Sequence, residues 1–465
     1  QNKFFGGFAM SKMMKRVETT ALALAMTASV AVIAASCANN PNAQPGQYTY
    51  RTATTALGTN WNPHTWDTNA DQAILLYVTQ PFVDMSIKDS TKGEYQWVYE
   101  MATSVTDVTK EHQSDLTKYG VTLQDGKTAE TTESGFVFEI KLNPDAKWEN
   151  GEKITADDYI YSMQQLLNSK MRNYRANLYI AGESALAGAA AYYNSEAPIY
   201  SPVVPPYGED DTPDYSFDLD SQPTYINLTS TDMTLSSYSF ADIYGMGYIA
   251  DIYDEEDPTK LVQPGETNYL TLAADANAYG YIEMTEENKE LALVVMDQYL
   301  SAFGLSIYDE DGAVVEDLYK EFLFYNTGDF GTKVNYDDVV GCYKVDEYTI
   351  RYVNQTYIDI NYFMTSLTST WLVYEDLYEA GKDTTGELVT TNYGTSKETT
   401  MSYGIYKIDS YQEERQMVFV QNENWYGFEE GEDGKLVSYT NFDVDGEKQL
   451  QYQTTRIVID VMTPD

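Results

Sequence analysis

The chain has 465 residues, a hydrophobic content of 43% and a formal net charge of −43. Its length exceeds one ordinary domain, and its apolar content is enough for a sizeable core. The charge argues against nucleic acid and anionic lipid surfaces as partners, because both would repel the chain. The 42 tyrosines outnumber all other aromatic residues, and most of them are expected on half-buried strands.

The N-terminal region has the pattern of a targeting segment followed by a tether. Three basic residues precede an apolar run at 20–35 that is too short to span a membrane. Small residues then precede Cys37, as in a lipoprotein signal. We therefore expect residues 1–36 to be upstream residues plus signal peptide, and 37–47 to be the lipidated cysteine with a flexible polar tether. A plain secretory signal with an incidental cysteine is the alternative.

Regular structure is expected from residue 48 onward. Alternating side chains over 48–52 predict a strand, and apolar residues at helical spacing predict a helix over 69–80 that Pro81 stops. A loop at 58–68, rich in aromatic and polar residues, lies between them. Apolar alternation over 135–142 predicts a half-buried strand.

The most informative stretch is 141–167, KLNPDAKWENGEKITADDYIYSMQQLL. It predicts the end of a strand, a tight loop carrying Trp148, and a helix with Thr155 as its N-cap and Asp158 completing a capping box. These residues resemble the W-(S/E)-(D/N)-G-x-x-(V/I)-T-A-x-D-(V/Y)-x-Y-S segment of the family 5 extracellular solute-binding proteins. That family comprises the oligopeptide- and dipeptide-binding components of ABC importers.

The resemblance covers most of 48–194 and 335–465. Single positions depart from the family pattern: Ile405 stands where proline is usual, and the aromatic residues of the NENWYG turn are transposed. The further segments that resemble the family are 57–66, 174–193, 345–351, 404–408 and 422–427.

The resemblance implies an α/β fold on a periplasmic-binding-protein-like type II (cluster C) scaffold. Residues 48–194 would form the first part of a solute-binding lobe, and 335–465 its remainder up to the crossover into a second lobe. Residues 195–334 are expected to be an acidic insertion, partly ordered, with one helix at 286–303. Because family members continue beyond such a crossover, we expect a C-terminally truncated chain with mainly the first lobe and the second lobe largely missing.

Two segments supply the candidate binding residues. In the resembling family, the loop after the first strand lies near the cleft between the lobes, and a later segment approaches it too. Aromatic faces and hydrogen-bonding groups there could hold a flexible solute. The candidates are Trp61, Asn62, His64, Trp66, Trp371 and Tyr374. The alternative is that the tryptophans of the loop pack beneath the next helix and that His64 merely orders the loop.

Nothing in the sequence predicts catalysis or a metal site. The chain lacks GxSxG, HExxH, CxxC and Walker A motifs, and His64 and His112 are its two histidines. Residues 441–446 imitate the start of a calcium loop, but the twelfth position is Tyr452 instead of an acid. A hairpin turn explains the same residues. We expect no cofactor, no metal and no enzymatic activity.

The resemblance therefore implies a lipid-anchored solute-binding protein on the outer face of the cytoplasmic membrane, on the extracellular or periplasmic side. It would capture peptides or another small solute, as a monomer, and deliver them to the permease subunits of an ABC importer, with no nucleic-acid partner. In the family, the acidic residue that fixes a peptide amine belongs to the second lobe, so the isolated chain is expected to bind weakly or not at all. The alternatives are an oligosaccharide-binding member of the family, a surface-anchored hydrolase such as a glycosidase or peptidase, and a non-transporting adhesin.

Overall fold

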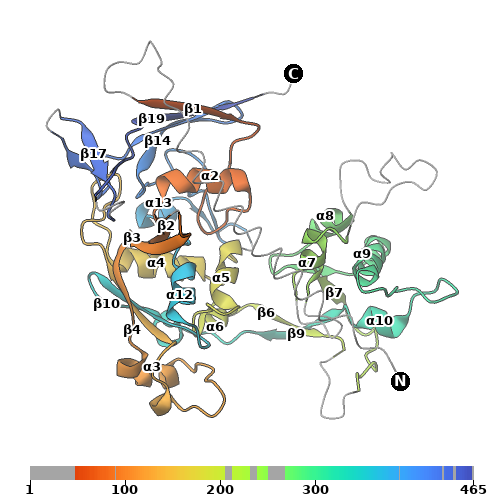
Figure 1. Ribbon diagram of the computed structural model, residues 1–465. Helices are drawn as coiled ribbons and strands as arrows, with labels where there is room; N and C mark the ends of the chain where they lie inside the picture. The colour runs from red at the N-terminus through yellow and green to blue at the C-terminus, as the bar shows by residue number, and fades with distance from the viewer. Residues whose placement is uncertain are drawn as a thin grey trace.

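The computed structural model describes residues 48–89, 91–204, 212–230, 238–249, 268–386, 388–431, 434–442 and 447–462. They form a body and a smaller satellite unit, which is joined to the body by an arm of two strands (Figure 1). The expected signal peptide, Cys37, the tether and residues 443–446 of the calcium-like loop lie outside the described residues. Within the described part of the chain, no helix is long and apolar enough to cross a membrane.

The first sheet of the body joins the two ends of the described chain. Its order is β1-β19-β15-β14, and β1 pairs with β19 in parallel, from Thr49 opposite Arg456 onward. Helix α2 packs on this sheet, where its Ile74 and Val78 meet Phe419. The elements concerned are β1 (Thr49–Thr54), α2 (Asn69–Val78), β14 (Tyr406–Gln412), β15 (Gln416–Gln421) and β19 (Arg456–Val461).

The second sheet of the body has the order β10-β11-β5-β4. Its inward side chains belong to the largest core cluster, in which the ring of Phe138 stacks on that of Phe363 with centroids 4.0 Å apart. Cys342 is fully buried in this sheet, and burial raises the pKa of its thiol to about 12. The strands are β4 (Ala102–Asp107), β5 (Val137–Leu142), β10 (Cys342–Asp346) and β11 (Thr349–Val353).

The capped helix predicted from the most informative stretch is confirmed as α4 (Ala156–Leu166). The Asp158 carboxylate accepts hydrogen bonds from the Thr155 backbone N–H at 2.8 Å and from Trp148 Nε1 at 3.1 Å. One carboxylate therefore caps the helix and holds the buried indole, so this stretch forms a rigid corner.

The predicted ends of two other helices differ from the observed ones. Helix α2 ends at Val78, two residues before the predicted end, because Thr79 is already extended ahead of Pro81. Helix α9 covers Lys289–Ser301 instead of 286–303, since its first turn is replaced by hydrogen bonds between the Thr285 and Asn288 segments. Both helices are therefore present as predicted, and their exact ends depend on local turns.

The satellite unit has its own hydrophobic core, centred on Phe240, Tyr299 and Phe322. Its sheet has the order β6-β9-β7-β8, and β6 and β9 also form the arm to the body (Figure 1). Residues 195–334 contain 28 acidic residues against four lysines. The elements are β6 (Pro198–Pro202), β7 (Thr224–Asn227), α7 (Phe240–Gly245), α8 (Asn268–Ala273), β8 (Tyr281–Glu283), α9, α10 (Glu316–Lys320) and β9 (Phe324–Phe330).

The α/β class predicted from the sequence is confirmed, whereas the domain boundaries stay a prediction.

The remaining elements of the described chain are short. These elements are β2 (Val83–Asp89), β3 (Glu94–Tyr99), α3 (Gln113–Lys118), α5 (Asn177–Ile180), α6 (Ala189–Tyr193), α11 (Tyr336–Val339), α12 (Ile360–Ser366), α13 (Glu375–Ala380), β12 (Lys382–Asp383), β13 (Thr390–Thr391), β16 (Glu429–Glu430), β17 (Leu436–Tyr439) and β18 (Leu450–Gln451), with 3-10 turns at Thr109–His112, Ala129–Thr131 and Tyr174–Ala176.

Candidate functional site

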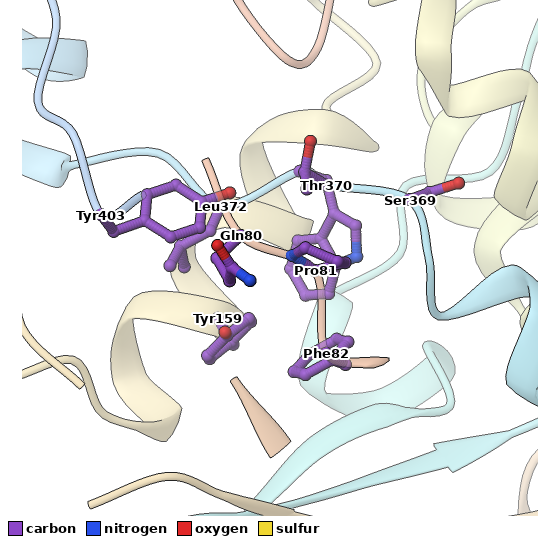
Figure 2. Close-up of a pocket in the computed structure, with 9 residues that line it drawn as sticks. Gln80, Pro81, Phe82, Tyr159, Ser369, Thr370, Leu372 and Tyr403 are labelled. Carbon is purple, nitrogen blue, oxygen red and sulfur yellow. The ribbon is translucent and has the colours of Figure 1, made fainter. Parts of the chain in front are cut away.

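A small cavity lies where the chain leaves α2 and meets α4 and the segment that follows α12. Its volume is about 10 Å³, which is enough for about one water molecule. Figure 2 shows the Gln80 side chain between the Tyr403 ring and Pro81. Of the six candidates from the sequence, Trp371 lines this cavity. The full lining is Gln80, Pro81, Phe82, Tyr159, Ser369, Thr370, Trp371, Leu372 and Tyr403.

Packed aromatic rings make the wall of the cavity rigid. Trp371 is buried and meets the rings of Phe82, Tyr159 and Tyr179 edge-on, with centroid distances of 6.0, 5.4 and 6.3 Å. Burial raises the pKa of the Tyr159 and Tyr403 hydroxyls well above the ordinary value, so both stay neutral. The wall is therefore uncharged, and its polar atoms include the Gln80 amide and the hydroxyl groups.

The backbone beside the cavity has unpaired donors. The N–H groups of Thr370 and Trp371 donate to no acceptor within the described residues, whereas the N–H of Leu372 hydrogen-bonds to the Tyr403 hydroxyl. The segment is neither helix nor strand. The next N–H, of Val373, donates to Ser162 Oγ at 3.0 Å. Backbone N–H groups that lack a protein partner are normally paired with water or with a ligand. The Thr370 and Trp371 N–H groups can therefore donate to water or to a ligand.

His64 holds this segment in place. Its side chain is fully buried, with Nε2 2.8 Å from the Trp371 carbonyl oxygen and Nδ1 3.0 Å from Tyr378 Oη. Burial lowers the pKa of His64 to about 4, against the opposing effect of the Trp371 hydrogen bond. The ring is therefore neutral near pH 7, and its bond to a carbonyl assigns the proton to Nε2. His64 is a positioning residue that ties the 58–68 loop to the backbone at Trp371.

The other buried loop candidates make internal contacts. Trp61 Nε1 donates to Thr400 Oγ1 at 2.8 Å, and its ring lines a second cavity next to the first. Asn62 is 1% exposed, and its Oδ1 accepts the N–H of His64 at 2.9 Å. Their present contacts are those of the packing alternative, and their assignment as ligand-binding residues stays a prediction.

The last two candidates lie apart from the cavity wall. Trp66 is half-buried, and the guanidinium carbon of Arg175 lies 3.4 Å from the centroid of its ring. Tyr374 donates a hydrogen bond to Glu152 at 2.5 Å, which is the main reason that its pKa is raised to about 12. The structure thus brings His64 and Trp371 into contact, and places Trp66 and Tyr374 at other positions.

Sequence reasoning missed three residues of the cavity wall, Gln80, Tyr159 and Tyr403, and it missed Arg175 beside Trp66. Two of them had a usable signal, because Gln80 precedes the helix-stopping proline and Tyr159 belongs to the capped helix. Tyr403 and Arg175 had none, since their positions depend on contacts with residues far away in the sequence.

Comparison with known proteins identifies the segment that carries the capped helix. Residues 96–198 match the model of the bacterial extracellular solute-binding proteins, family 5, middle region. The match contains strand β5, the Trp148 loop and helix α4, and it confirms the resemblance found in the sequence. A comparison with curated proteins gave no match to the chain.

Solved structures similar to this chain include the substrate-binding domain of an oligopeptide ABC transporter from Bacillus anthracis, with 12% identity and a TM-score of 0.41, covering 90% of this chain and 42% of that one. Listeria monocytogenes OppA bound to peptide has 12% identity and a TM-score of 0.35, with 90% and 43% covered. The Escherichia coli murein tripeptide binding protein MppA has 11% identity and a TM-score of 0.35, with 89% and 42% covered. The chain therefore spans less than half the length of these proteins.

Proposed function

We propose that this chain is the solute-capturing part of a peptide importer, which binds peptides outside the cytoplasmic membrane and delivers them to ABC permease subunits. The observation that carries this proposal is the family 5 match over residues 96–198. The N–H groups of Thr370 and Trp371, which are unpaired within the described residues, support a peptide as the solute. A peptide backbone offers carbonyl oxygens as acceptors for such donors.

The proposal includes an anchor and a division of labour along the chain. Cys37 would carry the lipid that holds a monomer at the outer face of the membrane. The body would contribute Trp66, Trp371 and Tyr374 to the solute, and residues 195–334 would be an accessory insertion.

Calorimetry on the 465-residue chain tests the proposal. Pooled peptides of two to five residues are titrated into the protein, and the recovered peptides are analysed by mass spectrometry. Saturable binding with unchanged peptides supports the proposal. Cleaved peptides would favour the hydrolase alternative, and binding of oligosaccharides but not peptides would favour the sugar-binding one. Absence of binding to either class refutes capture by this chain.

A pair of variants at Thr370 tests the backbone contact. Thr370→Pro removes one N–H donor, and Thr370→Ala keeps it. We expect Thr370→Pro to weaken peptide binding about fivefold, the value of one hydrogen bond of about 1 kcal/mol, and Thr370→Ala to leave it unchanged. Equal affinities of the two variants would show that peptides do not use this donor. Far-UV circular dichroism checks that both variants fold.

A further inference from the structure

Arg175 has no carboxylate partner among the residues that the structure describes, although the chain is very acidic. The chain has 72 acidic against 29 basic residues, and many described cations, such as Arg351 with Glu139, form ion pairs. Within the described residues, no carboxylate oxygen lies within 4.0 Å of the Arg175 guanidinium. Asp67 lies beyond that distance, although its charge slightly favours the protonated form. The positive charge of Arg175 is therefore not neutralised by direct contact.

The geometry holds the Arg175 guanidinium flat and leaves its two terminal nitrogens without a hydrogen bond in the described part of the chain. Its central carbon lies 3.4 Å from the centroid of the Trp66 ring and 5.1 Å from that of Tyr174. Nε donates to the Trp66 carbonyl at 2.9 Å, and the two terminal nitrogens form no hydrogen bond within the described residues. A stacked guanidinium is preorganised, and its terminal N–H groups match the two oxygens of a carboxylate. Tyr174 is 58% exposed beside it.

The neighbouring Arg172 differs in this respect. Its guanidinium stacks on Tyr193, and its Nη1 donates to the Tyr193 carbonyl at 3.1 Å and to Asn194 Oδ1 at 3.2 Å. Its ring contact with Tyr279, at 5.5 Å, connects the body to the satellite unit. These contacts explain Arg172 as a structural link, whereas the contacts of Arg175 leave its charged edge unexplained.

Arg175 and the unpaired backbone segment are both fixed by His64. The backbone N–H of Arg175 donates to the His64 carbonyl at 3.1 Å, and His64 Nε2 bonds to the Trp371 carbonyl at 2.8 Å. One buried residue therefore sets the position of a cationic group and of the segment with free N–H donors. A peptide with a free carboxylate carries both kinds of acceptor.

We propose that Arg175 binds a carboxylate group of the solute through its two terminal nitrogens, with Trp66 and Tyr174 as aromatic walls. The inference rests on the proposed function and deepens it: the solutes are peptides with a free C-terminal or side-chain carboxylate. A single carboxylate suits the site better than a phosphate dianion, because one arginine neutralises one negative charge. The second charge of the phosphate would stay uncompensated and would be repelled by the net charge of −43.

The first test measures affinity on the full chain. Peptides with a free C-terminus and the same peptides with a C-terminal amide are titrated into the wild type, Arg175→Gln and Arg175→Lys. We expect Arg175→Gln to weaken binding of the free acids about tenfold or more, with no effect on amides that lack acidic side chains. Arg175→Lys keeps the charge and should lose part of the affinity. Arg415→Gln, an exposed arginine in the β14–β15 turn, is the matched control.

The second test uses the wild type and needs no variant to fold. Phenylglyoxal modifies accessible arginines, and peptide mapping reports the modification of Arg175 alone. N-acetylphenylalanine at millimolar concentration should protect Arg175, whereas its amide should not. If peptides bind but neither protection nor a free-acid preference depends on Arg175, this inference is wrong and the proposed function stands. If no peptide binds, the proposed function fails, and protection by N-acetylphenylalanine alone decides whether the carboxylate site exists.

Discussion

Acidification should destabilise this protein through one buried imidazole. His64 is fully buried, and its Nδ1 and Nε2 both face hydrogen-bond partners instead of solvent. Its pKa falls from 6.5 to about 4 in the folded chain, mainly because burial disfavours the charged ring. Between these values the unfolded chain binds more protons than the folded chain. Stability is therefore lost as the pH falls from about 6.5 towards 4, and it is retained at higher pH.

The size of the effect follows from the two pKa values. At pH 4.5 the unfolded ring is almost fully protonated, while most folded molecules keep it neutral. With an unfolded pKa of about 6.5 and a folded pKa of about 4, linkage gives a loss of about 2.5 kcal/mol between pH 7.5 and pH 4.5. A loss of this size is a large fraction of the stability of a typical domain.

Urea unfolding at the two pH values measures this loss. The drop in the free energy of unfolding between pH 7.5 and pH 4.5 should be about 2.5 kcal/mol smaller in His64→Gln than in the wild type. Each variant is compared with itself at the two pH values. The stability that the substitution loses by removing hydrogen bonds is therefore present at both pH values and cancels. His112→Gln, at a half-exposed position, controls for the loss of a histidine. An equal drop in His64→Gln and the wild type would refute a neutral, buried His64.

Two other substitutions test burial and backbone geometry. Burial raises the pKa of Glu100 to about 7, although a hydrogen bond from Tyr426 opposes the shift. The stability that protonated Glu100 contributes at low pH is therefore lost as the pH rises through 7. Glu100→Gln should therefore raise the melting temperature at pH 8 more than at pH 5, and an equal shift at both would contradict this. Gly188→Ala would place a Cβ atom 1.8 Å from the Val339 carbonyl oxygen at a φ of +72°, with an expected loss of at least about 2 kcal/mol in urea unfolding. Gly182→Ala, also at positive φ but with open space around it, should lose only about 1 kcal/mol, and similar losses in the two variants would show that the Val339 contact is unimportant.

The sequence predicted part of the site and missed the part that depends on long-range contacts. Trp371 was identified as a candidate, and it does line the cavity. His64 was identified for its hydrogen-bonding groups, but its burial depends on Tyr378, which is 314 residues away in the sequence. The terminal nitrogens of Arg175, unpaired within the described residues, had no signal, because an arginine that lacks an ion pair looks in sequence like any other arginine. Burial and pairing are properties of the packed chain, and a residue list does not contain them.

The sequence by itself determined the local elements. The capping box at Thr155 and Asp158 sets the start of α4, and the alternation before it sets β5, because these features depend on residues within one or two turns. Only the tertiary structure decided that β1 pairs in parallel with β19, since nothing in either strand names its partner some 400 residues away. It also decided that one buried histidine, His64, hydrogen-bonds both to the backbone N–H of Arg175 and to the backbone carbonyl of Trp371. Such positions result from close packing of distant segments, where each contact depends on all the others.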